Sequence, residues 1–204
     1  MNRQLLFSPV LKNIVLSLVC LFFVISFAAN AANESEGKAQ VPPQGPPAWF
    51  AEYLAYFTQA GGCWITSNDA YRSAQETTDS YVVQWNYAIS KQSKRASLYG
   101  IDDGERTSDF WEMHVYWDGI FQSIRVDQFG HHGIVGHAEL VRQKKGVMEQ
   151  NMTFALTDGR SWKDRHIIEL LDDSHKTTSY EWEGEQWVQK RSYIWQRCDA
   201  SLAN

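Results

Sequence analysis

The stretch Gly61-Gly62-Cys63-Trp64-Ile65-Thr66-Ser67 decides the fold when it is set against Trp195-Gln196-Arg197-Cys198 near the other end of the chain. The numbers of opposing residues in an antiparallel strand pair have a constant sum, and the pairs 64 with 197 and 63 with 198 share one sum. A single register therefore places Trp64 opposite Arg197 and Cys63 opposite Cys198, on opposite faces of the sheet. Directly opposed residues lie within disulfide range. We expect a Cys63–Cys198 disulfide that joins the first strand to the last; the alternative is two unpaired core residues.

Short runs of β-branched and aromatic residues, separated by Gly and Asp-Gly turns, follow one another from Gly61 onward. Connections this short force antiparallel neighbours, and a meander of this length usually closes on itself. The segment 47–60 repeats its aromatic residues at helical spacing, and Gly61-Gly62 ends it. The sequence thus predicts an all-β protein, a single antiparallel up-and-down barrel of about 8–10 strands preceded by one short helix. The expected strands lie near 61–67, 80–89, 95–101, 108–117, 120–129, 133–141, 147–156, 162–170, 175–183 and 186–197.

Gly62-Cys63-Trp64 is a Gly-x-Trp motif that opens the first strand after a short helix, and Arg197 ends the last strand. This combination resembles the calycin signature of lipocalins and their relatives. Residues 48–198 are similar to a group of uncharacterised secreted bacterial lipocalin-like domains. The resemblance implies that Gly62, Trp64 and Arg197 are structural: the tryptophan plugs the barrel base and the arginine packs across it.

The first 31 residues have the pattern of a signal peptide. Arg3 and Lys12 precede an apolar run from Ile14 to Phe27, and Ala29-Asn30-Ala31 offers a cleavage site. The rival interpretation is an uncleaved anchor, for which this run is short. We expect a periplasmic or secreted protein without a stable membrane anchor after cleavage. Residues 32–47 contain four prolines and predict a disordered tether, and residues 48–199 predict one barrel domain.

The charge balance limits the choice of partner. The whole chain has 19 Lys and Arg against 24 Asp and Glu, and loss of two cations with residues 1–31 leaves 17 against 24, a net charge of -7. No block of Lys and Arg supplies the clustered positive field that a nucleic acid or an anionic membrane surface needs. A small, partly apolar molecule is the partner that the composition favours.

The register at Trp64 and Arg197 lets the inner face be followed along the neighbouring strands. The register predicts that Arg191, Tyr193 and Trp195 point inward. With a two-residue turn at 184–185, the other predicted inward residues of this hairpin are Thr178, Tyr180, Trp182, Trp187 and Gln189. The predicted outward residues are Glu181, Glu183 and Val188. Asp164, His166 and Ile168 form the more apolar alternation of the preceding strand. Apolar walls with a few convergent polar groups are typical of small-molecule sites; the alternative is that the polar groups are satisfied structural residues. The predicted ligand-binding residues are Trp85, Gln128, Met152, His166, Tyr180, Arg191 and Tyr193.

The Asp118-Gly119 dipeptide predicts a two-residue hairpin turn between the strands near 108–117 and 120–129. That register opposes Glu112 with Arg125. Hydrophobicity favours the face with Trp111, Met113, Val115 and Trp117 inside, which leaves Glu112 and Arg125 as a surface pair. The other face, which also carries His114, would make a charged aromatic wall.

Metal and cofactor motifs are missing from the sequence. His131-His132 and His137 lack a recognisable ligand spacing, so we expect no metal, and zinc is the first candidate to test if one binds. We expect no cofactor, since no phosphate-binding Gly loop, nucleophile elbow or haem-attachment motif is present. Three classes of function remain: an exported binding barrel, a small enzyme using His166 with Asp164 or Glu112 with His114 as general base, and a packed interaction module without a cavity. Catalysis is the less favoured class, and we name no catalytic residue.

Overall fold

The computed structural model describes residues 45–199, apart from the side chain of Ser90. The predicted signal peptide over 1–31 and nearly all of the predicted tether over 32–47 lie outside this range. Within the described part, no helix is long and apolar enough to cross a membrane.

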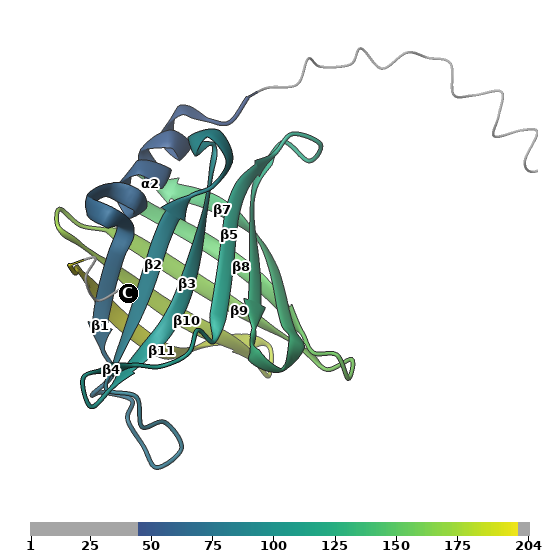
Figure 1. The fold of residues 1–204 in the computed structure, drawn as a ribbon. Coiled ribbons are helices and arrows are strands. Elements are labelled where there is room, and N and C mark those ends of the chain that lie inside the picture. The colour runs from purple at the N-terminus through teal and green to yellow at the C-terminus, as the bar shows by residue number, and fades with distance from the viewer. Residues whose placement is uncertain (1–44, 200–204) are drawn as a thin grey trace, which may run out of the picture. The chain divides into compact units, whose positions relative to one another are not determined.

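Ten antiparallel strands form a closed barrel, as the sequence predicts (Figure 1). Each strand pairs with the next along the chain, except that the two-residue β4 pairs only with the end of β3, and β3 pairs with β5. Strand β11 returns to pair with β1. The strands are β1 (Cys63–Ser67), β2 (Ser80–Tyr87), β3 (Ser93–Asp102), β4 (Glu105–Arg106), β5 (Trp111–Asp118), β6 (Ser123–Gly130), β7 (Ile134–Lys144), β8 (Val147–Ala155), β9 (Ser161–Leu170), β10 (Ser174–Glu183) and β11 (Gln186–Arg197).

The helical segments are short. The α-helix α2 (Ala48–Thr58) continues into the 3-10 helix η1 (Gln59–Gly62), and two further 3-10 turns are η2 (Ile89–Lys91) and η3 (His131–Gly133). Helix α2 buries Phe50, Tyr53, Leu54 and Phe57 in the core that the barrel strands share. It therefore closes one end of the barrel, where the β2–β3 and β9–β10 turns also lie (Figure 1).

The seam between β1 and β11 has the predicted register. Trp64 pairs with Arg197, and Cys63 and Cys198 form a disulfide with Cα atoms 5.1 Å apart. Trp64 is completely buried, its Nε1 donates a hydrogen bond to the carbonyl of Phe57 at 3.0 Å, and the Arg197 guanidinium lies 4.6 Å from a Trp64 ring centroid. Trp64 thus packs against the end of α2, and Arg197 lies across its ring.

Gly62 fits a position that admits only glycine. Its φ is +72°, a left-handed conformation that disfavours side chains. A β-carbon there would also collide with the carbonyl oxygen of Trp85 on β2. The glycine of the Gly-x-Trp motif thus permits the close approach of η1 to the neighbouring strand.

One predicted alternation is wrong because of a β-bulge. The predicted two-residue turn joins β10 to β11, and Tyr180 pairs with Gln189 as expected, but Ser179 then pairs with Arg191. Lys190 is therefore the extra residue of β11. Since side chains alternate every residue, one extra residue reverses every face assignment carried across it.

The bulge changes which residues of this hairpin face the interior. The residues of β10 that pair with inward residues of β9 and β11 are the odd-numbered ones. Hence Thr178, Tyr180, Trp182, Trp187 and Gln189 lie on the outer face, while His175, Thr177, Ser179, Glu181, Glu183 and Val188 lie on the inner face.

The hairpin of β5 and β6 also differs from the prediction, although its faces do not. Asp118 pairs with Ser123, so the loop has four residues rather than two. The Asp118 carboxylate accepts hydrogen bonds from the backbone N–H groups of Ile120 at 2.9 Å and Phe121 at 3.2 Å, which stabilises the longer turn. Glu112 consequently pairs with Phe129 and Arg125 with Tyr116, not with each other. The register shifts by an even number of residues, so Trp111, Met113, Val115 and Trp117 still belong to the inner face.

Candidate functional site

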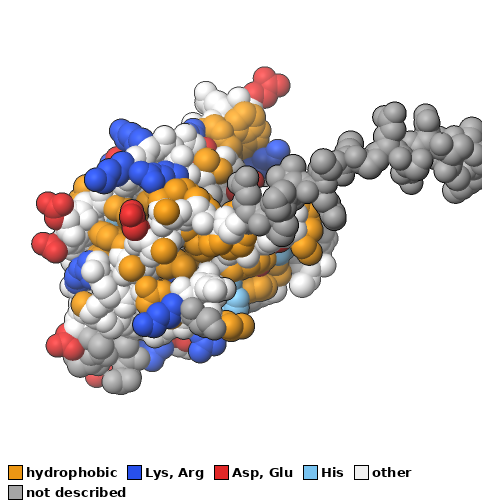
Figure 2. Space-filling view, turned by 90° about the horizontal axis from the view of Figure 1, so that it is seen from above, with side chains coloured by type: hydrophobic (Ala, Val, Ile, Leu, Met, Phe, Trp, Pro, Cys, Tyr) orange, Lys and Arg blue, Asp and Glu red, His pale blue; other side chains and the backbone are white. Residues whose placement is uncertain are grey.

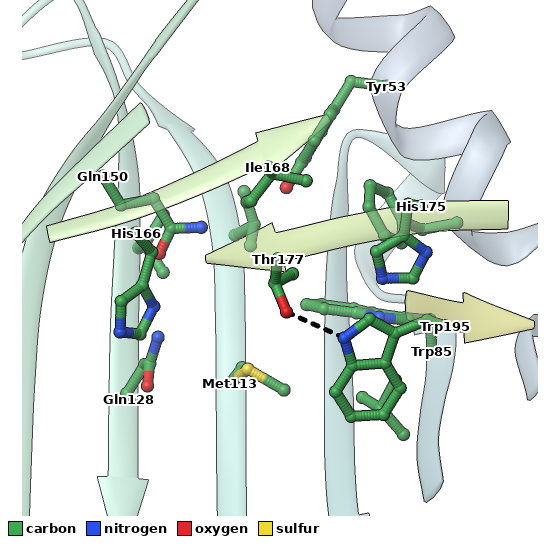
Figure 3. Close-up of a pocket in the computed structure, with 14 residues that line it drawn as sticks. Tyr53, Trp85, Met113, Gln128, Gln150, His166, Ile168, His175, Thr177 and Trp195 are labelled. Atoms are coloured by element: carbon green, nitrogen blue, oxygen red, sulfur yellow. Dashed lines mark hydrogen bonds between the residues drawn. The ribbon is translucent and has the colours of Figure 1, made fainter. Parts of the chain in front are cut away.

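A cavity of about 90 Å³ lies below α2 and is lined by residues of α2, β2, β5, β6, β8, β9, β10 and β11 (Figure 3). Rings and aliphatic groups make most of its wall, and a few polar groups interrupt them. Side chains therefore do not fill the space below α2 completely. The lining residues are Tyr53, Phe57, Val83, Trp85, Met113, Val115, Val126, Gln128, Gln150, His166, Ile168, His175, Thr177 and Trp195.

One part of the cavity wall is polar. Gln128, Gln150 and His166 come from β6, β8 and β9, and their side chains lie beside one another in Figure 3. Gln128 Oε1 accepts a hydrogen bond from Trp111 Nε1 at 2.6 Å. Gln150 Oε1 is buried without a hydrogen-bond partner among the described residues. Burial lowers the pKa of His166 to about 4, so its imidazole is neutral at physiological pH.

Another part of the wall combines rings with two more polar side chains. Trp195 Nε1 donates a hydrogen bond to Thr177 Oγ1 at 2.8 Å, and the imidazole of His175 stacks on the Trp195 ring with centroids 5.9 Å apart. His175 Nδ1 is buried, and within residues 45–199 nothing hydrogen-bonds to it. Burial, followed by repulsion from the nearby Arg197, lowers the pKa of His175 to about 3. Both histidines of the cavity are thus neutral groups that can donate or accept one hydrogen bond at each ring nitrogen.

Three of the seven predicted ligand-binding residues line the cavity, namely Trp85, Gln128 and His166. Met152 is buried in the core beside Gly136 but does not line the cavity. Tyr180 lies on the outer face, where it pairs with Arg165, so the prediction that it points inward is wrong. The β-bulge at Lys190 is the physical reason.

Arg191 and Tyr193 point inward but belong to a polar network away from the cavity lining. The terminal nitrogens Nη1 and Nη2 of Arg191 both donate to the carboxylate of Glu76 at 2.5 Å, and Tyr193 Oη donates to Asn68 Oδ1 at 3.0 Å. The hydrogen bonds from Arg191, followed by the one from Tyr81, overcome burial and lower the pKa of Glu76 to about 2. Because their polar atoms are paired within the protein, Arg191 and Tyr193 tie the segment 68–79 to β11.

The carboxylate of Asp164 and the imidazole of His166 do not form the hydrogen bond that a general-base pair uses. Their closest atoms are 3.9 Å apart. Burial, followed by repulsion from Glu181, raises the pKa of Asp164 to about 6. Asp164 therefore titrates near neutral pH, while His166 stays neutral.

The remaining histidines lie away from the cavity. His114 Nε2 contacts Glu112 at 2.7 Å, and His137 Nδ1 contacts Asp127 at 2.7 Å, both on the outer face of the β5–β7 sheet. His131 and His132 form the exposed turn η3. Within residues 45–199, no three His, Cys, Asp or Glu side chains are grouped to hold a metal ion.

Gln150, His175 and Thr177 are cavity residues that the sequence analysis missed. His175 and Thr177 were missed because the bulge reversed the faces of β10. Gln150 carries a signal that was available in the sequence: it alternates with Met148 and Met152 on a strand whose other face contains Glu149 and Asn151.

Comparison with known proteins adds no family: no family model matches the chain, and no curated protein matches it.

Proposed function

We propose that this protein is an exported, lipocalin-like barrel that binds a small, partly apolar molecule in its interior cavity. The closed ten-stranded barrel, the Gly-x-Trp plug and the arginine across it support the lipocalin-like part of the proposal. The Cys63–Cys198 disulfide is typical of an oxidising compartment such as the periplasm or the cell exterior.

The observation that carries the binding proposal is the chemistry of the cavity wall. Gln150 Oε1 and His175 Nδ1 belong to cavity-lining residues and have no partner within the described chain. A buried polar atom without a hydrogen bond costs about 1–3 kcal/mol. A guest molecule with a suitably placed hydroxyl or amine would recover part of that cost, while the rings of Trp85 and Trp195 would cover its apolar part.

The cavity size limits the guest. A volume of about 90 Å³ is well below the roughly 300–1,000 Å³ of pockets that hold drug-sized ligands. The cavity therefore suits a molecule built around one ring or a short chain, with one hydrogen-bonding group. Long-chain lipids and polycyclic compounds exceed it.

A matched pair of probes tests the proposal: toluene, which offers only a ring, and benzyl alcohol, which adds one hydroxyl group. Binding is followed by calorimetry and by the fluorescence of the cavity tryptophans. We expect the wild type to bind benzyl alcohol about 3- to 10-fold more tightly than toluene, because a hydrogen bond to a buried acceptor contributes about 1 kcal/mol.

A matched pair of variants places the binding inside the barrel. Gln150→Leu removes one of the two unpartnered polar atoms and is expected to reduce the preference for benzyl alcohol. Gln189→Leu makes the same change on the outer face, at an exposed position opposite Tyr180, and should keep the wild-type preference. If neither probe binds the wild type at millimolar concentration, the binding proposal is wrong.

A further inference from the structure

Lys94 lies inside the barrel with its ammonium group surrounded by aromatic rings. It pairs with Tyr87 on β2 and with the cavity residue Val115 on β5, which places it on the inner face of β3. Its side chain is 1% exposed. The Nζ atom lies 3.5 Å from the ring centroid of Phe57, 3.8 Å from that of Trp85 and 4.0 Å from that of Tyr53.

The amine of Lys94 has no hydrogen-bond acceptor among the residues that the structure describes. Lysine is among the residues least often buried without a partner, because removing its charge from water is costly. Desolvation holds the pKa of Lys94 well below its ordinary value. A buried lysine of this kind presents a neutral amine, which is a nucleophile, whereas an exposed ammonium ion is not.

The amine does not itself line the cavity or the surface groove, but rings of its cage line both. Tyr53, Phe57 and Trp85 form both the cage around Nζ and part of the cavity wall. Tyr53 also lines a groove of about 300 Å³ between α2 and the β7–β8 and β9–β10 turns. Hydrophobic side chains gather on this end of the barrel (Figure 2). The Tyr53 ring is thus the shared wall of groove, cage and cavity, and its rotation would connect all three.

We infer that Lys94 is a covalent ligand-binding residue that holds a small aldehyde in the cavity as an imine; this inference rests on the proposed binding function and specifies its ligand class. The nitrogen lone pair forms a bond to the carbonyl carbon, and a proton passes from nitrogen to the carbonyl oxygen to give a carbinolamine. The second amine proton then passes to the hydroxyl group, which leaves as water: the C–O bond breaks, and the nitrogen lone pair forms the C=N bond. The step needs no oxidant, reductant or further reactant, and hydrolysis with one water reverses it.

The cage suits the product as well as the amine. A neutral imine carries no charge, so the three ring faces within 4.0 Å of the nitrogen can enclose it without a counter-ion, as they enclose the neutral amine. The remainder of the aldehyde would occupy the cavity, where the rings that line it contact an apolar body. Aldehydes built around one ring or a short chain match the volume.

The experiment uses benzaldehyde with sodium cyanoborohydride at pH 7, which converts an imine irreversibly into a benzylamine, followed by peptide mapping of every lysine. An exposed amine of ordinary pKa is neutral in about one molecule in 2,500 at this pH. We expect Lys94 to be labelled at least 10-fold faster than the exposed Lys163 in the same molecules. Lys94→Met should lose the fast labelling, and the matched surface variant Lys163→Met should keep it. Circular dichroism confirms that both variants fold.

The outcomes separate this inference from the proposed function, because benzyl alcohol binding is measured on the same samples. Benzyl alcohol binding with label confined to exposed lysines overturns the imine and leaves the binding barrel standing. No binding and no label at Lys94 overturns both. Tyr53→Ala tests the route: it should accelerate labelling of Lys94 several-fold, and an unchanged rate contradicts entry past Tyr53.

Discussion

Replacing both Cys63 and Cys198 by alanine removes the covalent link at the seam where β1 meets β11. The ladder at this seam consists of Trp64 with Arg197 and Ile65 with Gln196, whereas its neighbour between β10 and β11 runs the length of both strands. The disulfide therefore fastens the shortest junction of the barrel. It also joins residues 135 positions apart, so it strongly restricts the unfolded chain.

The magnitude follows from the length of the closed loop. The chain-entropy relation gives about 5 kcal/mol for a loop of this size at 25 °C. Small domains are stable by roughly 5–15 kcal/mol in total, so the double variant should lose a third or more of its unfolding free energy. For a domain of this length the loss corresponds to a fall in Tm of about 10–20 °C.

Urea unfolding followed by tryptophan fluorescence, together with calorimetry, measures the loss. The wild type is studied with and without reductant, and the double variant under the same two conditions as the control. We expect reduction to lower the stability of the wild type to that of the variant and to leave the variant unchanged. A loss below about 1 kcal/mol in the variant would refute the argument that loop length and the short seam make this bond a major source of stability.

Three further predictions concern the plug, the cage and the network at the other end of the barrel. Gly62→Ala should destabilise the protein by about 2–5 kcal/mol, because the left-handed backbone disfavours a side chain and the β-carbon collides with β2. Gly104→Ala is the control: its φ is also positive, at +83°, but the space around it is open, so it should cost about 1 kcal/mol. Equal losses of stability in urea unfolding would contradict the collision. Lys94→Met should stabilise the fold more at pH 7 than at pH 10. The unfolded chain protonates Lys94 below about pH 10.4, whereas the native state resists protonation, so the wild type loses stability as the pH falls below that value and the gain from Lys94→Met grows. Unfolding curves at pH 7 and pH 10 measure the two gains, and equal gains would contradict this assignment. Arg191→Met should remove the stabilisation of the Glu76 carboxylate, whose pKa is lowered from 4.5 to about 2. The wild type should therefore have the higher free energy of unfolding above about pH 4.5, and this difference should disappear as the pH falls to about 2. A difference that stays constant across an acid titration would contradict this assignment.

The strands and the seam register could be predicted from the sequence because both depend on local or pairwise patterns. Runs of β-branched and aromatic residues with Gly turns mark each strand, and two matched pairs of residue numbers fix how the first strand meets the last. The inner face of β5 and β6 was also predicted correctly although the turn was not. A loop two residues longer moves the register by an even step, and side chains alternate with a period of two, so their faces survive.

The inner face of β10 could not be predicted because a single unmarked residue decides it. The bulge at Lys190 adds one residue to β11, and nothing in the local composition distinguishes a bulged lysine from a paired one. Because of this extra residue, Tyr180 lies on the outer face and not in the predicted site, whereas His175 and Thr177 line the cavity. Buried pairing is likewise invisible in the sequence: Arg191 and Tyr193 have the residue types of a ligand site, but Glu76 and Asn68, from a distant loop, already occupy their polar atoms.

Pairing of polar atoms separates the interior of this barrel into two regions. In the network around Arg191 and Glu76, charged groups and hydroxyls are joined by short hydrogen bonds, so a ligand there would have to break them. Beneath α2, by contrast, Lys94, Gln150 and His175 each have a buried polar atom without a partner within residues 45–199. Four other atoms of this kind lie elsewhere in the described residues, but Gln150 and His175 both belong to the cavity lining, and Lys94 lies behind its aromatic wall. Each such atom costs about 1–3 kcal/mol or more. A guest that supplies the missing partners turns this cost into affinity, which is why the cavity beneath α2, rather than the charged network, is the site at which function is to be sought.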